Sequence, residues 1–389
     1  MQKTNFMHAV FIAVVFFPFV VIVPLLPTDL QPNALLFCAL VFVYLLSQGK
    51  IILNKEQVIL LFSLVGVLGV IPIREFTMET IRSITNYISI FMISLVSLYY
   101  FKKYGLKENA IKICILIWCF VGAVQYFIHI DFLTSLLRLA RTTESRGVTS
   151  LSQEPSFYGI ILFFFMFFVK DFKRHRIFFF ALIVVQSLLF SQSALGIILL
   201  FIFFLMFLFG DMSGKIQIRI GVLGAILGII MFHIIRTFFY GRRIAFLLNS
   251  FLTGDILRDE SVQDRYFAIT DSISGTVNNF FLPHGFYARI MSGFGAVLYE
   301  LGLLGFPLIF VICMAIANCF NRNKVLLMLL AFVSLLPAIQ LAHPMLALVV
   351  GYGWYKRCLR EDSKIKNITN DHIVSGHNIS LSKYDKRGL

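Results

Sequence analysis

Hydrophobic residues form long runs along this 389-residue chain, and short polar links separate the runs. The runs are roughly 13 to 25 residues long, which suits a hydrocarbon core about 30 Å thick. Since backbone groups in lipid must bond within their own segment, each run predicts a helix. The predicted spans are residues 6–26, 33–47, 58–73, 84–101, 113–130, 157–169, 177–190, 194–209, 218–235, 295–320, 325–336 and 338–355. The pattern predicts an all-α, polytopic membrane protein with about twelve transmembrane helices.

The last two runs leave their topology open. Both are short, and Pro337 and Pro344 lie in or beside them. Because proline interrupts a helix, one bent helix or a re-entrant pair are alternatives to two separate spans.

Composition agrees with the membrane class. The chain is 59% hydrophobic and only 14% charged, with a mean hydropathy of +0.85, which excludes an ordinary soluble domain. The first run lacks a small-residue cleavage site after a short apolar core, so we expect a retained helix. Five of the six cysteines lie in predicted spans and the sixth, Cys358, follows the last one, so we expect no disulfides.

Lysine and arginine divide between alternate links. All lysines before the C-terminal tail lie in one set of links or at the N-terminus, whereas every basic residue in the opposite set is an arginine. The positive-inside rule places the lysine links and both termini in the cytoplasm. The net charge of +14 is largely explained by this topology, so we expect no nucleic-acid partner.

Two outward segments are longer than ordinary links. Residues 1–235 are predicted to hold nine spans and an outward loop at 131–156, and residues 236–294 form a large outward loop. Residues 295–355 hold the last three spans, and 356–389 form a cytoplasmic tail. Apolar residues in the large loop are spaced as in short amphipathic helices, which favours a folded cap on the membrane surface.

The first outward loop ends at a helix entrance. Glu154 and Pro155 precede the run at 157–169, where a carboxylate is favoured by the helix dipole and proline is tolerated. Taken by itself, Glu154 is therefore interpreted as an acid that caps the helix. Arg146, followed by Gly147, suggests instead a ligand site, because glycine lets the backbone approach a ligand closely. Arg141 belongs to the same loop and is a substrate-binding candidate.

The large loop contains further arginines, namely Arg258, Arg265 and Arg289. Arginine offers a planar fork of donors that matches phosphate oxygens, so an outward face with arginine but no lysine suggests bidentate recognition. The structural alternative for each of these arginines is that it only keeps the exposed face of a surface helix polar. Among them, Arg265 is the preferred catalytic candidate.

His284 and Glu300 follow in the next stretch. His284 lies between Pro283 and Gly285 in a turn, and not on an apolar helix face. Glu300 lies inside the predicted tenth span, where a carboxylate is a functional candidate by default. The structural alternative for Glu300 is a packing partner for an arginine.

The chain resembles the O-antigen polymerase and O-antigen ligase superfamily of bacterial membrane glycosyltransferases, which are GT-C-like. The resemblance rests on Arg146, on the entry Glu154-Pro155-Ser156, on the long outward loop, and on the stretch from Pro283-His284-Gly285-Phe286 to Glu300-Leu-Gly-Leu-Leu-Gly305. It implies a polymerase that transfers a growing glycan from undecaprenyl diphosphate to a hydroxyl of a lipid-linked repeat unit. The product would be an O-antigen, a capsule or another exopolysaccharide.

The resemblance also implies site residues and partners. Arg146, Arg265 and Arg289 would hold the diphosphate, and Glu154 or His284 would accept the proton of the attacking hydroxyl. Arg141, Arg258 and Glu300 would bind substrate. A chain-length regulator and a flippase of the same pathway would be partners, beside the bilayer and the lipid-linked glycans. No outward Asp-x-Asp pair suits Mg²⁺ or Mn²⁺, so we expect neither metal nor cofactor.

Two alternatives remain open. An O-antigen ligase would move finished polymer onto a lipid A core, although ligases usually have another residue where this chain has Glu154. A flippase or transporter for lipid-linked oligosaccharide would also use many spans and a basic outward face. We find no internal repeat, which disfavours transport.

Overall fold

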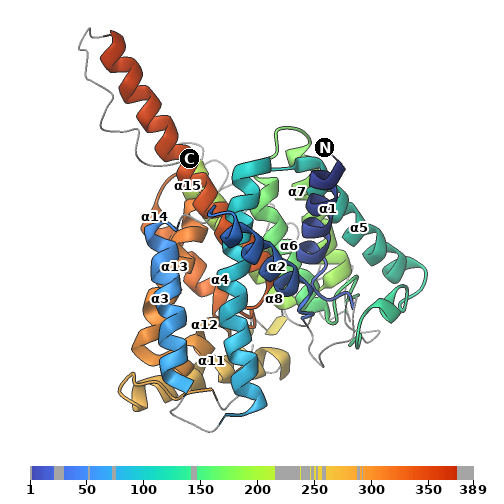
Figure 1. The fold of residues 1–389 in the computed structure, drawn as a ribbon. Helices are drawn as coiled ribbons and strands as arrows, with labels where there is room; N and C mark the ends of the chain where they lie inside the picture. Colours follow the sequence, from blue (N-terminus) through green and yellow to red (C-terminus); the bar gives the residue numbers. More distant parts are fainter. Residues whose placement is uncertain are drawn as a thin grey trace.

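The computed structural model describes residues 2–21, 30–50, 53–71, 76–141, 147–214, 260–286 and 292–374, with 237, 246, 249–250, 253–255 and 290. Every regular element in these ranges is a helix, as expected (Figure 1). The α-helices are α1 (Gln2–Phe16), α2 (Asn33–Ser47), α3 (Lys55–Val70), α4 (Met78–Tyr104), α5 (Glu108–Phe127), α6 (Pro155–Val169), α7 (Arg176–Val185), α8 (Ala194–Asp211), α11 (Glu260–Asn278), α12 (Gly293–Leu301), α13 (Gly305–Asn318), α14 (Lys324–Leu335) and α15 (Pro344–Val374).

Four stretches are long and apolar enough to cross a membrane. They are Met78–Tyr104, Glu108–Phe127, Ala194–Asp211 and Gly293–Asn318. Five shorter apolar helices accompany them in the described ranges. The chain is thus a helical protein with membrane-spanning candidates, and twelve spans stay a prediction; the predicted span at 218–235 lies outside the described residues.

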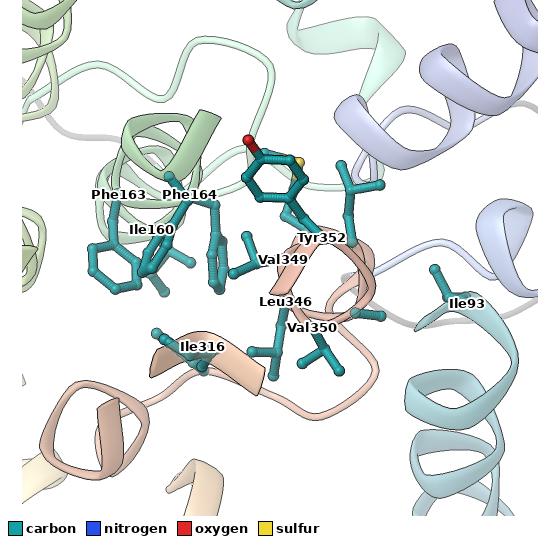
Figure 2. Packing of buried hydrophobic residues seen from close by; sticks show 14 of the residues in the cluster. Ile93, Ile160, Phe163, Phe164, Ile316, Leu346, Val349, Val350 and Tyr352 are labelled. Atoms are coloured by element: carbon teal, nitrogen blue, oxygen red, sulfur yellow. The ribbon is translucent and has the colours of Figure 1, made fainter. Parts of the chain in front are cut away.

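Helices α6 and α15 form the centre of the bundle. Every residue of α6 from Tyr158 to Val169 is buried, and so are the α15 residues from Met345 to Val350. A helix that is apolar on all sides belongs inside a bundle, since no polar face remains for solvent. Figure 2 shows Phe164 of α6 and Val349 of α15 in this core.

Glycines allow the central helices to touch their neighbours closely. A Cβ atom on Gly159 of α6 would lie 2.6 Å from the Cα of Gly196 in α8. A Cβ on Gly353 of α15 would lie 1.8 Å from the Ala315 carbonyl oxygen in α13. Small residues are typical of such backbone approaches between membrane helices, where van der Waals packing drives association.

The predicted first span is too long. Residues 6–26 were expected to be one helix, but α1 ends at Phe16. Pro18 follows two residues later; proline has no amide hydrogen and its ring clashes with the preceding turn, so the helix cannot continue.

The tenth span, predicted as one helix over 295–320, is bent. The 3-10 turn η5 (Gly302–Leu304) divides it, and Gly302 has φ +56°. Residues 297 and 305 would be about 12 Å apart along a straight helix, yet a Cβ on Gly305 would lie 2.9 Å from Val297 Cγ1. Since Gly293 N–H also bonds the Leu336 carbonyl beyond α14, α12 lies across the ends of α13 and α14.

Lysine side chains gather at one end of the bundle. This end holds Lys103, Lys170, Lys324 and Lys356. Helices α4, α6 and α13 end there, α14 begins there, and α15 passes beside it. We call it the lysine end, and it is uppermost in Figure 1. The opposite end, with the starts of α4, α6 and α12, is the arginine end. Which end faces the cytoplasm stays a prediction.

The final helices are separate. Helix α14 ends at Leu335 and α15 begins at Pro344, and residues 336–343 connect them. The two prolines therefore mark a break and not a bend within one helix. In the large loop, α11 is a 19-residue helix, so the expectation of folded structure is confirmed for residues 260–278.

Candidate functional site

Glu154 stands at the arginine end, immediately before α6. Pro155 occupies the first turn of the helix, as predicted. The Glu154 side chain accepts no capping hydrogen bond from a backbone amide of the helix. Its carboxylate instead pairs with Arg141 (Nη1 to Oε1, 2.5 Å) and accepts a hydrogen bond from Ser156 Oγ at 3.1 Å. Glu154 thus occupies the position that precedes the helix, as predicted, but its carboxylate contacts side chains and not the free amides of the first turn.

The loop that leads to Glu154 is fixed by buried polar groups. Gln125 of α5 donates to the Ser150 carbonyl at 2.9 Å and accepts from the Ser150 amide at 2.6 Å. The Val148 amide bonds the Phe190 carbonyl at 2.7 Å, within the π-helix η3 (Gln186–Ser191). Because buried polar groups are costly unless bonded, these contacts specify one conformation of the loop.

Gly147 has a different role from the expected one. A Cβ atom there would lie 2.0 Å from the Ser191 carbonyl oxygen. The glycine thus lets the loop backbone approach η3, whereas the sequence suggested an approach to a ligand. The close contact is between two segments of the same chain.

Arg141 reaches Glu154 through the backbone as well as the side chain. The Arg141 amide donates to the carbonyl of Gln153 at 2.7 Å, and Gln153 is the residue before Glu154, so Arg141 lies beside Glu154. The side chains stay partly accessible, at 41% for Arg141 and 27% for Glu154. We call Glu154, Arg141 and Ser156 the Glu154 group; it joins a carboxylate and a guanidinium at an accessible helix entrance.

Three of the predicted arginines cannot be placed. Arg146, Arg258 and Arg289 lie outside the described residues. Arg265 lies on α11 with a half-buried side chain.

Glu300 and His284 belong to a second cluster at the arginine end. Glu300 is buried in α12, and its carboxylate accepts hydrogen bonds from Ser83 Oγ at 2.8 Å and from the Tyr87 hydroxyl at 2.6 Å. Both donors are on α4. The structural alternative for Glu300 was an arginine partner. Its direct hydrogen-bond donors are two hydroxyls, and Arg82 interacts with the carboxylate electrostatically.

His284 stacks on Tyr299, with ring centroids 4.1 Å apart. Its amide donates to the Tyr299 carbonyl at 3.2 Å, and its Nδ1 is buried without a hydrogen-bond partner. The imidazole is thus held by stacking and backbone contacts. We call Glu300, Ser83, Tyr87 and His284 the Glu300 group.

The α4 hydroxyls were not predicted as part of the site. Thr80, Ser83 and Tyr87 follow one another at spacings of three and four residues, so they share one helix face. This polar stripe at the start of an apolar span was the available signal. The partner of the stripe, more than 200 residues away, leaves no local trace.

The Glu154 group contains the elements of acid–base chemistry on an anionic substrate. The carboxylate can accept a proton, and the guanidinium can contact phosphate oxygens. Among the described residues, no group of three or more histidine, cysteine or acidic side chains could hold a metal ion.

Comparisons with known proteins do not identify a relative. No family profile matches the chain, and neither a curated protein nor a solved structure matches it significantly.

Proposed function

We propose that this protein is an outward-facing membrane glycosyltransferase that polymerises lipid-linked glycans. The observation that carries the proposal is the Glu154 group, an accessible ion pair at the entrance of a buried helix, next to a loop that buried hydrogen bonds hold in place. The sequence resemblance supports it, as does the restriction of outward basic residues to arginine. The arginine end is the outward face in this proposal.

In the proposed reaction, an acceptor hydroxyl attacks the anomeric carbon of the donor glycan. The carbon–oxygen bond to the diphosphate breaks, a glycosidic bond forms, and undecaprenyl diphosphate leaves with the bonding electron pair. Glu154 accepts the hydroxyl proton, with His284 as the alternative acceptor. Arg141, Arg146 and Arg265 meet the negative charge that develops on the departing diphosphate.

The ion pair gives Arg141 two roles. In the structure its guanidinium contacts the Glu154 carboxylate. A diphosphate offers the same fork a more highly charged acceptor. When Arg141 turns to the diphosphate, the Glu154 carboxylate is released to take the proton.

The test uses purified protein in nanodiscs with lipid-linked repeat units, with EDTA present and polymer length read on a gel. We expect wild-type protein to form a ladder of products. Arg141→Ala, Arg146→Ala and Arg265→Ala should each lower the rate about 10²-fold, the usual scale for one such donor. Lysine at these positions should restore only part, because a point charge cannot make a two-pronged contact.

Three outcomes would contradict the proposal. Activity that needs Mg²⁺ or Mn²⁺ would mean that arginine is not the main partner of the diphosphate. Transfer of finished polymer to a lipid A core would indicate a ligase. Movement of lipid-linked glycan across a proteoliposome bilayer without polymerisation would indicate a transporter.

A further inference from the structure

We propose that Glu300 is a positioning residue and does not bind substrate: it joins α12 to α4 and thereby holds the turn at residues 281–286, which contains His284. The inference rests on the proposed function for its activity readout alone. It replaces the expectation that Glu300 contacts the lipid-linked substrate.

Both carboxylate oxygens of Glu300 are already engaged. Ser83 donates to one oxygen and Tyr87 to the other, and all three side chains are buried. Bonded on both sides and hidden from solvent, the group is suited to fastening two helices.

The last turn of α12 binds the 281–286 turn through its backbone. The helix stops at Gly302, so its final carbonyls have no partner further along the helix. The amides of His284 and Gly285 donate to the carbonyls of Tyr299 and Glu300, each at 3.2 Å. The turn therefore moves with the end of α12.

Two more hydrogen bonds hold the same turn, one from α4 and one from the residues that follow α12. Thr80 Oγ1, one turn before Ser83, donates to the Phe286 carbonyl at 3.1 Å. The Leu303 amide, beyond the helix break, donates to the Phe281 carbonyl at 2.9 Å. The turn is thus held between α4 and α12, and the Glu300 carboxylate joins these two helices directly.

The position of the His284 imidazole depends on α12. Its ring lies on Tyr299, the neighbour of Glu300, so a shift of α12 away from α4 would displace the imidazole. A displacement of about 1 Å can lower a catalysed rate about 10²-fold. Glu300 would therefore affect the reaction without touching the reacting atoms.

The experiment compares Glu300→Gln with Glu300→Ala in the full-length protein in nanodiscs. Glutamine keeps the length of the side chain, and its amide can still bond both hydroxyls, whereas alanine loses both bonds. Hydrogen exchange of the His284 and Gly285 amides should rise at least tenfold in the alanine variant and stay near wild type with glutamine. In the activity assay, if His284 is the proton acceptor, alanine should lower kcat about 10²-fold at unchanged KM, and glutamine should restore most of it; if Glu154 is the acceptor, the exchange of the amides alone should change.

Further variants serve as controls. Asp271→Asn makes the same carboxylate-to-amide change at an exposed position of α11, and should leave both readouts unchanged. Tyr87→Phe and Ser83→Ala each remove one donor to Glu300, so they should raise exchange at residues 284 and 285 even if Glu300→Ala does not fold.

Two results would overturn the inference. If exchange at 284 and 285 is unchanged in Glu300→Ala, Tyr87→Phe and Ser83→Ala, then Glu300 does not hold the turn. If glutamine fails as completely as alanine in activity while exchange stays normal, the negative charge itself is needed. Because exchange is measured without substrate, it judges the positioning role even if the protein proves not to be a polymerase.

Discussion

At the scale of single residues, Glu154 differs from an ordinary helix cap. A capping side chain accepts from the first free amides of its helix, but the Glu154 carboxylate points to Arg141 and Ser156 instead. The contacts of the Glu154 carboxylate in the described structure are thus side-chain contacts at a partly accessible surface.

Glu154→Gln tests whether this carboxylate takes a proton. The amide keeps the shape and can still accept hydrogen bonds from Arg141 and Ser156, but it is not a base. We expect the rate of chain growth to fall about 10²-fold or more, the scale of general-base catalysis, at normal protein level. A nearly silent substitution would transfer the role of base to His284.

At the scale of helices, close crossings depend on glycine. Gly159 and Gly196 meet where α6 crosses α8, and α6 is the helix that presents Glu154. The same crossing lies beside η3, whose Ser191 hydroxyl bonds the Pro155 carbonyl at 2.7 Å. Packing of α6 against α8 thus determines the position of the helix entrance.

Gly159→Ala should weaken this crossing. The added methyl group has no space beside Gly196, so the helices must separate, at a cost of about 1–3 kcal/mol. Thermal unfolding in detergent should show a lower melting temperature. Gly69→Ala in α3 is the matched control, since a Cβ there meets nothing within 4 Å; an equal loss of stability in both variants would mean that the crossing is not the cause.

At the scale of the whole molecule, a network of ion pairs connects helices at the lysine end. The buried Lys170 pairs with Asp171 at 3.2 Å and with Asp211 at 3.1 Å, and Lys356 of α15 pairs with Asp171 at 3.2 Å. The Tyr352 hydroxyl donates to Asp171 at 2.7 Å. The network ties α6, α8 and α15 together at the end opposite the candidate site.

The network predicts a pH dependence. Burial by itself raises the pKa of the Asp171 carboxyl, but Lys170, Lys356 and the Tyr352 hydroxyl together lower that pKa below its usual range. A carboxyl with a lowered pKa stabilises the fold above its ordinary value of about 3.9, and the contribution is lost as the pH falls through the lowered value.

Asp171→Asn should therefore lower the melting temperature at pH 7. Lys170 keeps its second partner Asp211, so losing the Asp171 charge should cost about 1.5–3 kcal/mol, the scale of hydrogen bonds to a charged group. The difference from wild type should shrink as the pH falls below about 4, where the unfolded-state carboxyl is protonated first and the native carboxyl follows at its lowered pKa. Glu361→Gln, at an exposed pair of the same end, should change stability by less than about 1 kcal/mol. A deficit that is constant with pH would show that the charge of Asp171 does not matter.

The same two ends lead to a prediction about the orientation of the molecule in the membrane. We expect reporter fusions after Lys103 and Arg176 to read as cytoplasmic, and fusions after Gly147 and Gly275 as exported, because lysine is retained inside. Lys103 lies at the lysine end, and Gly147 at the arginine end. An exported fusion at Lys103 would reverse the topology and remove the outward site on which the proposed function depends.

The sequence by itself determined most of the helices and the entrance of α6. Hydrophobic runs predict helices because every backbone group in an apolar segment bonds to a neighbour four residues away, so the information is local. The helix start at Pro155 follows from proline's fixed geometry in the same way. The end of α1 is also encoded locally, by Pro18, although the hydrophobic run continues beyond it.

Tertiary structure alone decided which polar groups meet. The sequence suggested Arg146 as the group that gives Glu154 its importance, but Arg141 is the described partner, because the backbone pairing of Arg141 with Gln153 sets the distance. Ser83 and Glu300 are 217 residues apart in sequence. The bend at Gly302 brings α12 across the bundle, and only this packing places Glu300 on α4, since contacts between distant segments depend on how all the helices fill space together.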